Sequence, residues 1–164
     1  MVTFDSEDFQ KQLQEIAERF RSKLEKGTED FIYRTADILI QSTPYGDDKL
    51  YRDLYLKRER EYGLAPFAGF SKGSWIMSFG SPAMVGAIVP DNRSGGKSQA
   101  RNHAIAHEFQ LGDVVYITNS VPYIEKLEKG SSQQAPDGIM EMSLGKLERL
   151  YGLNVAKILT GGKK

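Results

Sequence analysis

The chain has 164 residues, 40% of them hydrophobic and 27% charged, a balance that excludes a disordered chain and predicts one globular domain. Its 22 basic and 22 acidic residues give a formal net charge of zero, so no global attraction to nucleic acid or to an anionic membrane is expected. The absence of cysteine excludes disulfides and thiolate metal sites. Residues 1–10 lack a signal-peptide pattern, and we expect synthesis in the cytosol.

Apolar residues at helical spacing predict two N-terminal helices. The first covers about 5–26, and Gly27 is expected to end it. Its apolar face consists of Phe9, Leu13, Ile16, Phe20 and Leu24. The second helix starts at Thr28, which is expected to cap it, and runs to about residue 40. Pro44 then stops the helix, because the residue before a proline is pushed out of the helical region.

The middle of the chain is less regular. Leu50, Tyr51, Leu54 and Tyr55 predict a short helix that ends near Gly63. The apolar loop 64–70 either forms a contact surface or folds back over the domain's own core. Residues 74–79 alternate as in a strand, with Trp75 expected in the core. Residues 83–89 predict a weak strand or a loop, and 100–109 have helical spacing.

The C-terminal part begins with a strand at 113–118, where β-branched and aromatic residues cluster. A helical turn at 123–129 follows, with Gly130 as a left-handed cap. An uncharged polar loop, SSQQAP, then leads to Asp137. A helix is predicted at 139–151, and a last short helix at 154–159 precedes a frayed tail.

These elements predict a single α+β domain covering 1–164. A small antiparallel sheet, containing 74–79 and 113–118, is expected to pack against the N-terminal helices and the C-terminal helix.

Residues 91–98, DNRSGGKS, imitate a phosphate-binding loop. The pattern requires glycine where Asp91 stands, and a carboxylate there would oppose phosphate and lack the backbone freedom of glycine. We therefore favour a flexible basic loop, with Arg93, Lys97 and Arg101 as candidate contacts for DNA phosphates or an acidic partner. A phosphate- or nucleic-acid-binding module that uses this loop is the alternative function.

His103 and His107 share a helix face, which is suitable spacing for a divalent ion. Alanines at 104 and 106 stand where zinc-peptidase patterns require glutamate, so a solvated polar face is favoured. No serine lies in a G-x-S-x-G elbow. No catalytic residue, cofactor or metal site is predicted, and the chain is not expected to be an enzyme.

The segment 119–140, NSVPYIEKLEKGSSQQAPDGIM, follows the predicted strand at 113–118. It resembles a segment of the neck proteins of tailed bacteriophages, the head–tail connector or tail-completion family. The matching residues are Asn119, Pro122, Tyr123, Leu127, Glu128, Gly130, Ser132, Gln134, Ala135, Pro136 and Gly138. The residues 43–47 and 73–75 also resemble the two ends of a family segment, but here they enclose a longer insertion at about 46–72.

The resemblance implies a structural virion protein that forms a homo-oligomeric ring in the neck, between head and tail. Such a ring joins the portal side to the tail, as a tail terminator or as a separate adaptor, and lets DNA pass. The implied partners are further copies of the chain, adjacent neck or portal-adaptor proteins, tail-tube or sheath proteins, and the passing DNA, with no membrane. The implied location is the virion neck, after assembly in the host cytoplasm.

Ring closure requires two different patches on each subunit. We expect the loop at 130–138 and the insertion at 46–72 to supply them, because tyrosines in the insertion favour protein contacts over base stacking. The expected contact residues are Tyr123, Glu128, Ser131, Ser132, Gln133, Gln134, Pro136, Tyr51, Tyr55, Phe67 and Phe70.

Overall fold

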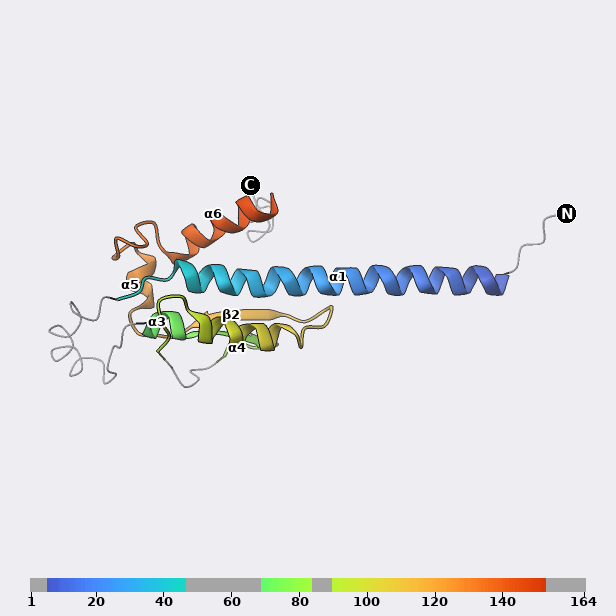
Figure 1. The fold of residues 1–164 in the computed structure, drawn as a ribbon, viewed down its shortest axis with the longest axis horizontal. Coiled ribbons are helices and arrows are strands. Elements are labelled where there is room, and N and C mark those ends of the chain that lie inside the picture. Colours follow the sequence, from blue (N-terminus) through green and yellow to red (C-terminus); the bar gives the residue numbers. More distant parts are fainter. Residues whose placement is uncertain (1–5, 47–68, 84–89, 153–164) are drawn as a thin grey trace.

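The computed structural model describes residues 6–46, 69–83 and 90–152 of the chain. The short helix expected to end near Gly63, the helix expected at 154–159, and nearly all of the weak strand at 83–89 lie outside these residues. The elements in chain order are α1 (Ser6–Ser42), α3 (Phe70–Gly73), β1 (Trp75–Phe79), α4 (Gly96–Ala106), β2 (Val115–Asn119), α5 (Ile124–Glu128) and α6 (Ile139–Tyr151) (Figure 1). Within the described ranges, none of the helices is both long and apolar enough to span a membrane.

A single helix, α1, replaces the two N-terminal helices expected from the sequence, so the predicted break at Gly27 and the predicted cap at Thr28 are wrong. A glycine inside a helix costs only about 1 kcal/mol relative to alanine. Burial of Ile32 and Ala36 in the turns that follow offsets this cost and keeps the helix continuous. The helix ends at Ser42, close to the expected stop before Pro44.

In the described part of the chain, β1 and β2 pair as a two-stranded antiparallel sheet. Trp75 lies opposite Asn119, and Phe79 lies opposite Val115. Both strands were predicted, with ends one or two residues away. Alternation along β1 directs Trp75 and Met77 inward, where they are only 5% and 1% exposed. The sequence prediction that Trp75 is a core residue is confirmed.

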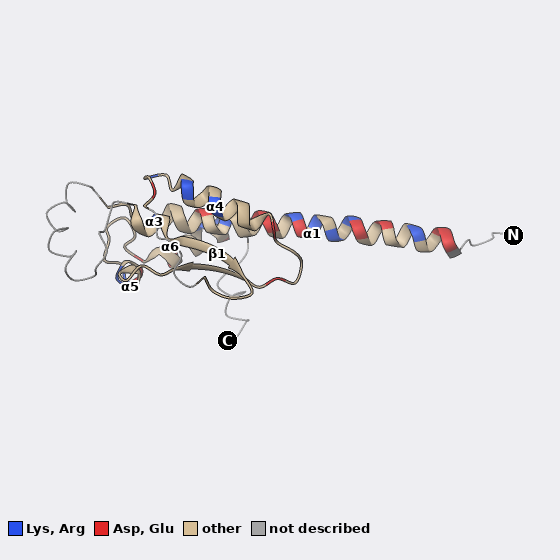
Figure 2. Ribbon diagram, turned by 90° about the horizontal axis from the view of Figure 1, so that it is seen from below, with Lys and Arg blue, Asp and Glu red and all other residues tan. Residues whose placement is uncertain are grey.

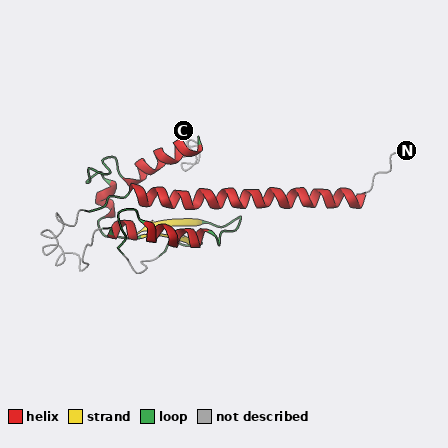
Figure 3. Ribbon diagram, in the orientation of Figure 1, coloured by secondary structure: helices red, strands yellow, loops and turns green. Residues whose placement is uncertain are grey.

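The C-terminal half of α1 lies between α6 on one side and the sheet with α4 on the other (Figure 1, Figure 3). The predicted fold class, an α+β domain whose small antiparallel sheet packs against N-terminal and C-terminal helices, is therefore confirmed. The N-terminal half of α1 extends beyond these layers (Figure 1).

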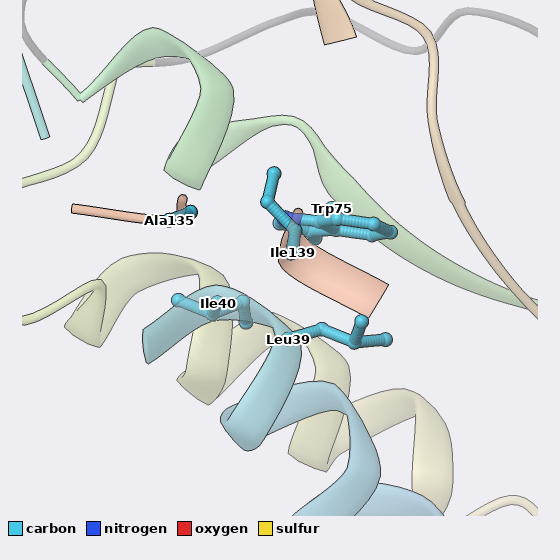
Figure 4. Close-up of a cluster of buried hydrophobic side chains, with 5 residues drawn as sticks. All are labelled: Leu39, Ile40, Trp75, Ala135 and Ile139. Carbon is cyan, nitrogen blue, oxygen red and sulfur yellow. The ribbon is translucent and has the colours of Figure 1, made fainter. Parts of the chain in front are cut away.

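Two clusters of buried apolar side chains hold the layers together. The first joins α1, β1, α6 and the loop before α6, and consists of Leu39, Ile40, Trp75, Ala135 and Ile139 (Figure 4). The second joins α1, β1 and α4, and consists of Ile32, Ala36, Met77 and Ala106. Because both clusters draw on the same helix, α1 positions β1, α4 and α6 around the site described next.

Candidate functional site

The segment that carries the family resemblance folds as one unit between β2 and α6, which we call the 119–138 unit. Asn119, at the end of β2, donates from its side-chain amide to the carbonyl oxygen of Ser71 at 2.8 Å. The short helix α5 then anchors the unit, because Ile124 and Leu127 pack against the first core cluster. The helical turn predicted at 123–129 is confirmed.

Two glycines allow the unit to fold tightly on itself. Gly130 has φ of 75°, as predicted for a left-handed cap, and a Cβ there would lie 2.1 Å from the carbonyl oxygen of Pro136. Gly138 has φ of 91°, and a Cβ there would lie 2.3 Å from the carbonyl oxygen of Glu128. Any other residue would be strained at both positions and would also collide with backbone.

The carboxylate of Glu128 caps the N-terminus of α6. It accepts hydrogen bonds from the backbone N–H of Ile139 at 3.0 Å and from that of Met140 at 3.1 Å. These N–H groups are among those that the helix itself leaves unpaired, and a negative charge is favourable there. The structure thus gives Glu128, an expected partner contact, a role inside its own chain.

Gln134 also bonds within the chain. Its side-chain amide donates to the carbonyl oxygen of Tyr45 at 2.9 Å, and its side-chain oxygen accepts from the Tyr45 N–H at 3.1 Å. Ser132 pairs with Ala135 in an isolated bridge, and Ala135 is fully buried. The two bonds between Gln134 and Tyr45 tie the polar loop to the segment that follows α1. A bond from Gln134 to a neighbouring subunit was expected instead.

Besides Glu128 and Gln134, the expected contact residues differ in their exposure. Ser131, Gln133 and Pro136 are exposed on the loop, while Tyr123 and Ser132 are half-buried. Phe70 is only 6% exposed, so its expected role as a partner contact is corrected to a buried packing residue. Tyr51, Tyr55 and Phe67 lie outside the described residues.

The loop that imitates a phosphate-binding motif is filled by its own carboxylate. Asp91 is 4% exposed and accepts hydrogen bonds from the backbone N–H groups of Asn92 and Lys97, at 2.8 and 3.2 Å. It also accepts from the backbone and hydroxyl of Ser98, at 2.6 and 2.7 Å. Burial acts to raise the pKa of Asp91, but the bonds from Ser98 and the backbone outweigh it and lower that pKa. Asp91 thus occupies the place at the start of α4 where a phosphate would sit.

The three basic residues assigned to DNA or to an acidic partner do not form one patch. Arg101 points inward and donates to the carbonyl oxygens of Gly73 and Trp75, at 2.9 and 2.8 Å. Arg93 lies over the ring of Tyr45, 5.3 Å from its centroid. Lys97 is exposed. The expectation that Arg101 reaches a partner is corrected, because its guanidinium supports β1.

The two histidines join α4 to α1. His103 bonds to Asp37 at 2.8 Å through Nε2, and His107 pairs with Glu29 through Nδ1. Each imidazole therefore has its own carboxylate, and the face expected to be solvated stays partly exposed while it also joins α4 to α1. Among the residues that the structure describes, no three His, Cys, Asp or Glu side chains form a group that could hold a metal ion.

Sequence analysis missed a buried lysine in α3 that bonds to the end of α1. Lys72 is 4% exposed, and its ammonium donates to the carbonyl oxygens of Ile40 and Gln41, at 2.7 and 3.3 Å. Burial, with a further contribution from Lys146, lowers the pKa of Lys72 to about 8. No local signal marks this lysine, because its partners lie about 30 residues away in the sequence.

A polar cluster joining α1 to α6 was also missed. Asp30 accepts hydrogen bonds from the hydroxyl groups of Tyr33 and Tyr151, at 2.5 and 3.2 Å, and from Arg34 at 2.8 Å. Burial and the charge of Asp30 raise the pKa of Tyr151 to about 12. The spacings of three and four residues could have predicted the contacts of Asp30 with Tyr33 and Arg34 on one helix. The contact with Tyr151, which is 121 residues away in the sequence, could not be predicted in this way.

Comparisons with models of protein families, with curated proteins and with solved structures found no match to this chain.

Proposed function

We propose that this chain is a structural subunit of the neck of a tailed bacteriophage, where identical copies form a ring that joins the head to the tail and lets DNA pass. The 119–138 unit carries the proposal. Its sequence resembles that of neck proteins, and in the structure its matching residues make the hydrogen bonds and tight turns that shape a polar loop. Glu128, Gly130, Gln134 and Gly138 each fix the loop from within.

A stiff loop is well suited to an assembly contact, because little conformational entropy is lost when a neighbour binds it. Its exposed residues include Ser131, Gln133 and Pro136, two with polar side chains and one with a fixed φ. In the proposed ring these three residues meet the next subunit or the next ring. The residues that hold the loop act as positioning residues.

Ring closure also needs a second, different patch. We assign it to the insertion at 46–72, keeping Tyr51, Tyr55 and Phe67 as contacts and removing the buried Phe70. The partners are further copies of the chain, adjacent neck or portal-adaptor proteins, and tail-tube or sheath proteins. The proposed location is the virion neck, reached after assembly in the host cytoplasm, and the role requires no catalysis.

The test is to co-express the chain with the neighbouring neck proteins and to examine the product by electron microscopy and native mass spectrometry. Rings that contain several copies are expected. Gln133→Arg should reduce ring formation at least tenfold, whereas Gln110→Arg, the same change at an exposed residue outside the unit, should leave it intact. Persistent monomers in the presence of the partners would contradict the neck function, and normal rings with Gln133→Arg would contradict only the loop assignment.

A further inference from the structure

The N-terminal half of α1, residues 7–26, forms an arm with an exposed apolar stripe. Every residue from 7 to 24 is exposed. The stripe residues are large and lie three or four apart, with exposed fractions of 45% for Phe9, 49% for Leu13, 59% for Ile16, 65% for Phe20 and 47% for Leu24. Spacing of this kind is that of a helix face that packs against a partner.

The rest of the same helix shows what such a face does when it is covered. Ile32, Ala36 and Leu39 follow at similar spacing and are 7%, 0% and 4% exposed, because α4, the sheet and α6 pack on them. The arm projects beyond these elements (Figure 1). A contiguous apolar stripe on an exposed helix marks an interaction surface.

The charges of the arm are divided between its two halves (Figure 2). Residues 7–18 carry four acidic side chains and one lysine, a net charge of three negative units. Residues 19–26 carry four basic side chains and one glutamate, a net charge of three positive units. The arm as a whole is neutral.

Interactions within the helix do not account for this division. Acidic residues near a helix N-terminus are favourable, but the effect falls off within the first turn, and residues 19–26 lie far from the end of α1 at Ser42. Two ion pairs, Glu15 with Arg19 and Arg21 with Glu25, are local, exposed and of small effect. The division matches a partner that presents the opposite order of charges.

We infer that the occupant of the stripe is the arm of a second copy of this chain, running antiparallel. With the pair centred between Ile16 and Ala17, Leu13 of one copy meets Phe20 of the other, and Phe9 lies level with Leu24. Residues 7–14, with a net charge of one negative unit, then lie beside the positive residues 19–26 of the other copy, while Glu15 of each copy lies level with Glu18 of the other at the centre. Parallel pairing would place like charges together.

The size of the stripe is sufficient for such a pair. Half-exposed side chains of this kind on two helices amount to about 1,000 Å² of buried surface, near the lower limit for a specific interface. A membrane surface fits less well, because helices that lie on anionic lipid are rich in Lys and Arg, and this arm is neutral. A reversible dimer with a dissociation constant in the micromolar range is expected.

Analytical ultracentrifugation of the full chain alone tests the pairing. A monomer–dimer equilibrium is expected, and Phe20→Gln should raise the dissociation constant at least tenfold. Ser22→Gln, on the opposite side of the same helical turns, is the matched control and should leave it unchanged. A chain that stays monomeric at every concentration overturns the inference. If that monomer binds vesicles containing phosphatidylserine, the stripe binds a membrane surface instead of a second copy.

Engineered cysteines test the orientation, since the chain has no cysteine of its own. Gln12 and Lys23 lie on the same side of the arm, because eleven residues make about three helical turns. In the antiparallel pair, Gln12→Cys of one chain lies beside Lys23→Cys of the other, so a mixture of the two variants should form disulfide-linked heterodimers. Either variant alone should cross-link little, because its own thiols would lie more than about 13 Å apart along the axis. Equal cross-linking of Gln12→Cys alone would overturn the antiparallel arrangement.

The arm contact goes beyond the proposed ring. A two-fold contact between arms differs from the head-to-tail contacts that close a ring. The arm test uses the chain alone, whereas the ring test requires the neighbouring neck proteins. Failure of one therefore does not decide the other.

Discussion

The carboxylate of Glu128, the last residue of α5, accepts a hydrogen bond from the backbone N–H of Ile139, the first residue of α6, at 3.0 Å. One side chain thereby closes the polar loop and starts the helix that follows it. Ile139 itself is fully buried in the first core cluster beside Trp75 (Figure 4). The cap and the core contact hold the start of α6 together.

Replacing Glu128 by alanine is expected to destabilise the protein by about 1–2 kcal/mol, because it leaves two helix N–H groups without their acceptor. Urea unfolding followed by circular dichroism would measure the change. Glu125→Ala, an exposed residue of the same short helix, is the control and should cost less than about 0.5 kcal/mol. Equal effects of the two substitutions would contradict the capping role.

Gly130→Ala and Gly138→Ala are each expected to destabilise the protein by more than about 2 kcal/mol. The positive φ values alone cost an L-residue roughly 1–2 kcal/mol. The new Cβ would also fall 2.1 or 2.3 Å from a backbone oxygen, which has to move. Thermal and urea unfolding would show both effects.

The control for these glycines is Gly145→Ala in α6, where a Cβ would meet nothing within 4 Å. This change should stabilise the protein by up to about 1 kcal/mol, because alanine has the higher helix propensity. If Gly130→Ala or Gly138→Ala behaved like Gly145→Ala, the close approaches in the 119–138 unit would be wrong.

Local patterns in the sequence predicted much of this fold. The strand β1 was predicted from alternation, the short helix α5 from its apolar spacing, and the cap at Gly130 from its residue type, and all three are confirmed. The break predicted at Gly27 is wrong, because a helix tolerates one glycine when packing of the turns that follow, at Ile32 and Ala36, keeps the helix continuous.

Long-range partners could not be predicted. Gln134 belongs to the polar loop and Glu128 to the short helix before it, and only the three-dimensional path of the chain brings them to Tyr45 and to the start of α6. Lys72 likewise gave no signal, because its carbonyl partners belong to another helix. Each pattern in the sequence reports on a few neighbouring residues, whereas these contacts join segments that are 11 to 89 residues apart.

Asp91→Asn is expected to destabilise the protein by about 1–3 kcal/mol at pH 7, because the amide can accept fewer of the bonds now made by Asn92, Lys97 and Ser98. The pKa of Asp91 is lowered in the folded state from 3.8, so its contribution is present above about pH 4 and is lost as the pH falls through the folded pKa. Urea unfolding from pH 7 down to pH 3 should show the wild type and the variant converging. A difference that stays constant over this range would contradict a charged Asp91.

Lys72 should make the protein more stable as the pH rises from about 8 to 10. The folded pKa is about 8 and the unfolded value 10.5, so within this window the unfolded chain keeps a proton that the folded chain has released. The complete shift corresponds to roughly 3 kcal/mol between pH 8 and pH 10.5. Above pH 10 the raised pKa of Tyr151, about 12, acts in the opposite sense, because the folded state then holds the extra proton.

Lys72→Met isolates this effect, since every other titrating group is shared with the wild type. The methionine cannot donate to the carbonyl oxygens of Ile40 and Gln41, so the absolute stability of the variant will also differ. The slope is therefore the informative quantity. The difference in unfolding free energy, wild type minus variant, should rise with pH from 8 to 10, measured by urea titration at each pH. Parallel curves would show that Lys72 keeps an ordinary pKa, and that its ammonium is held by the end of α1 without a cost from burial.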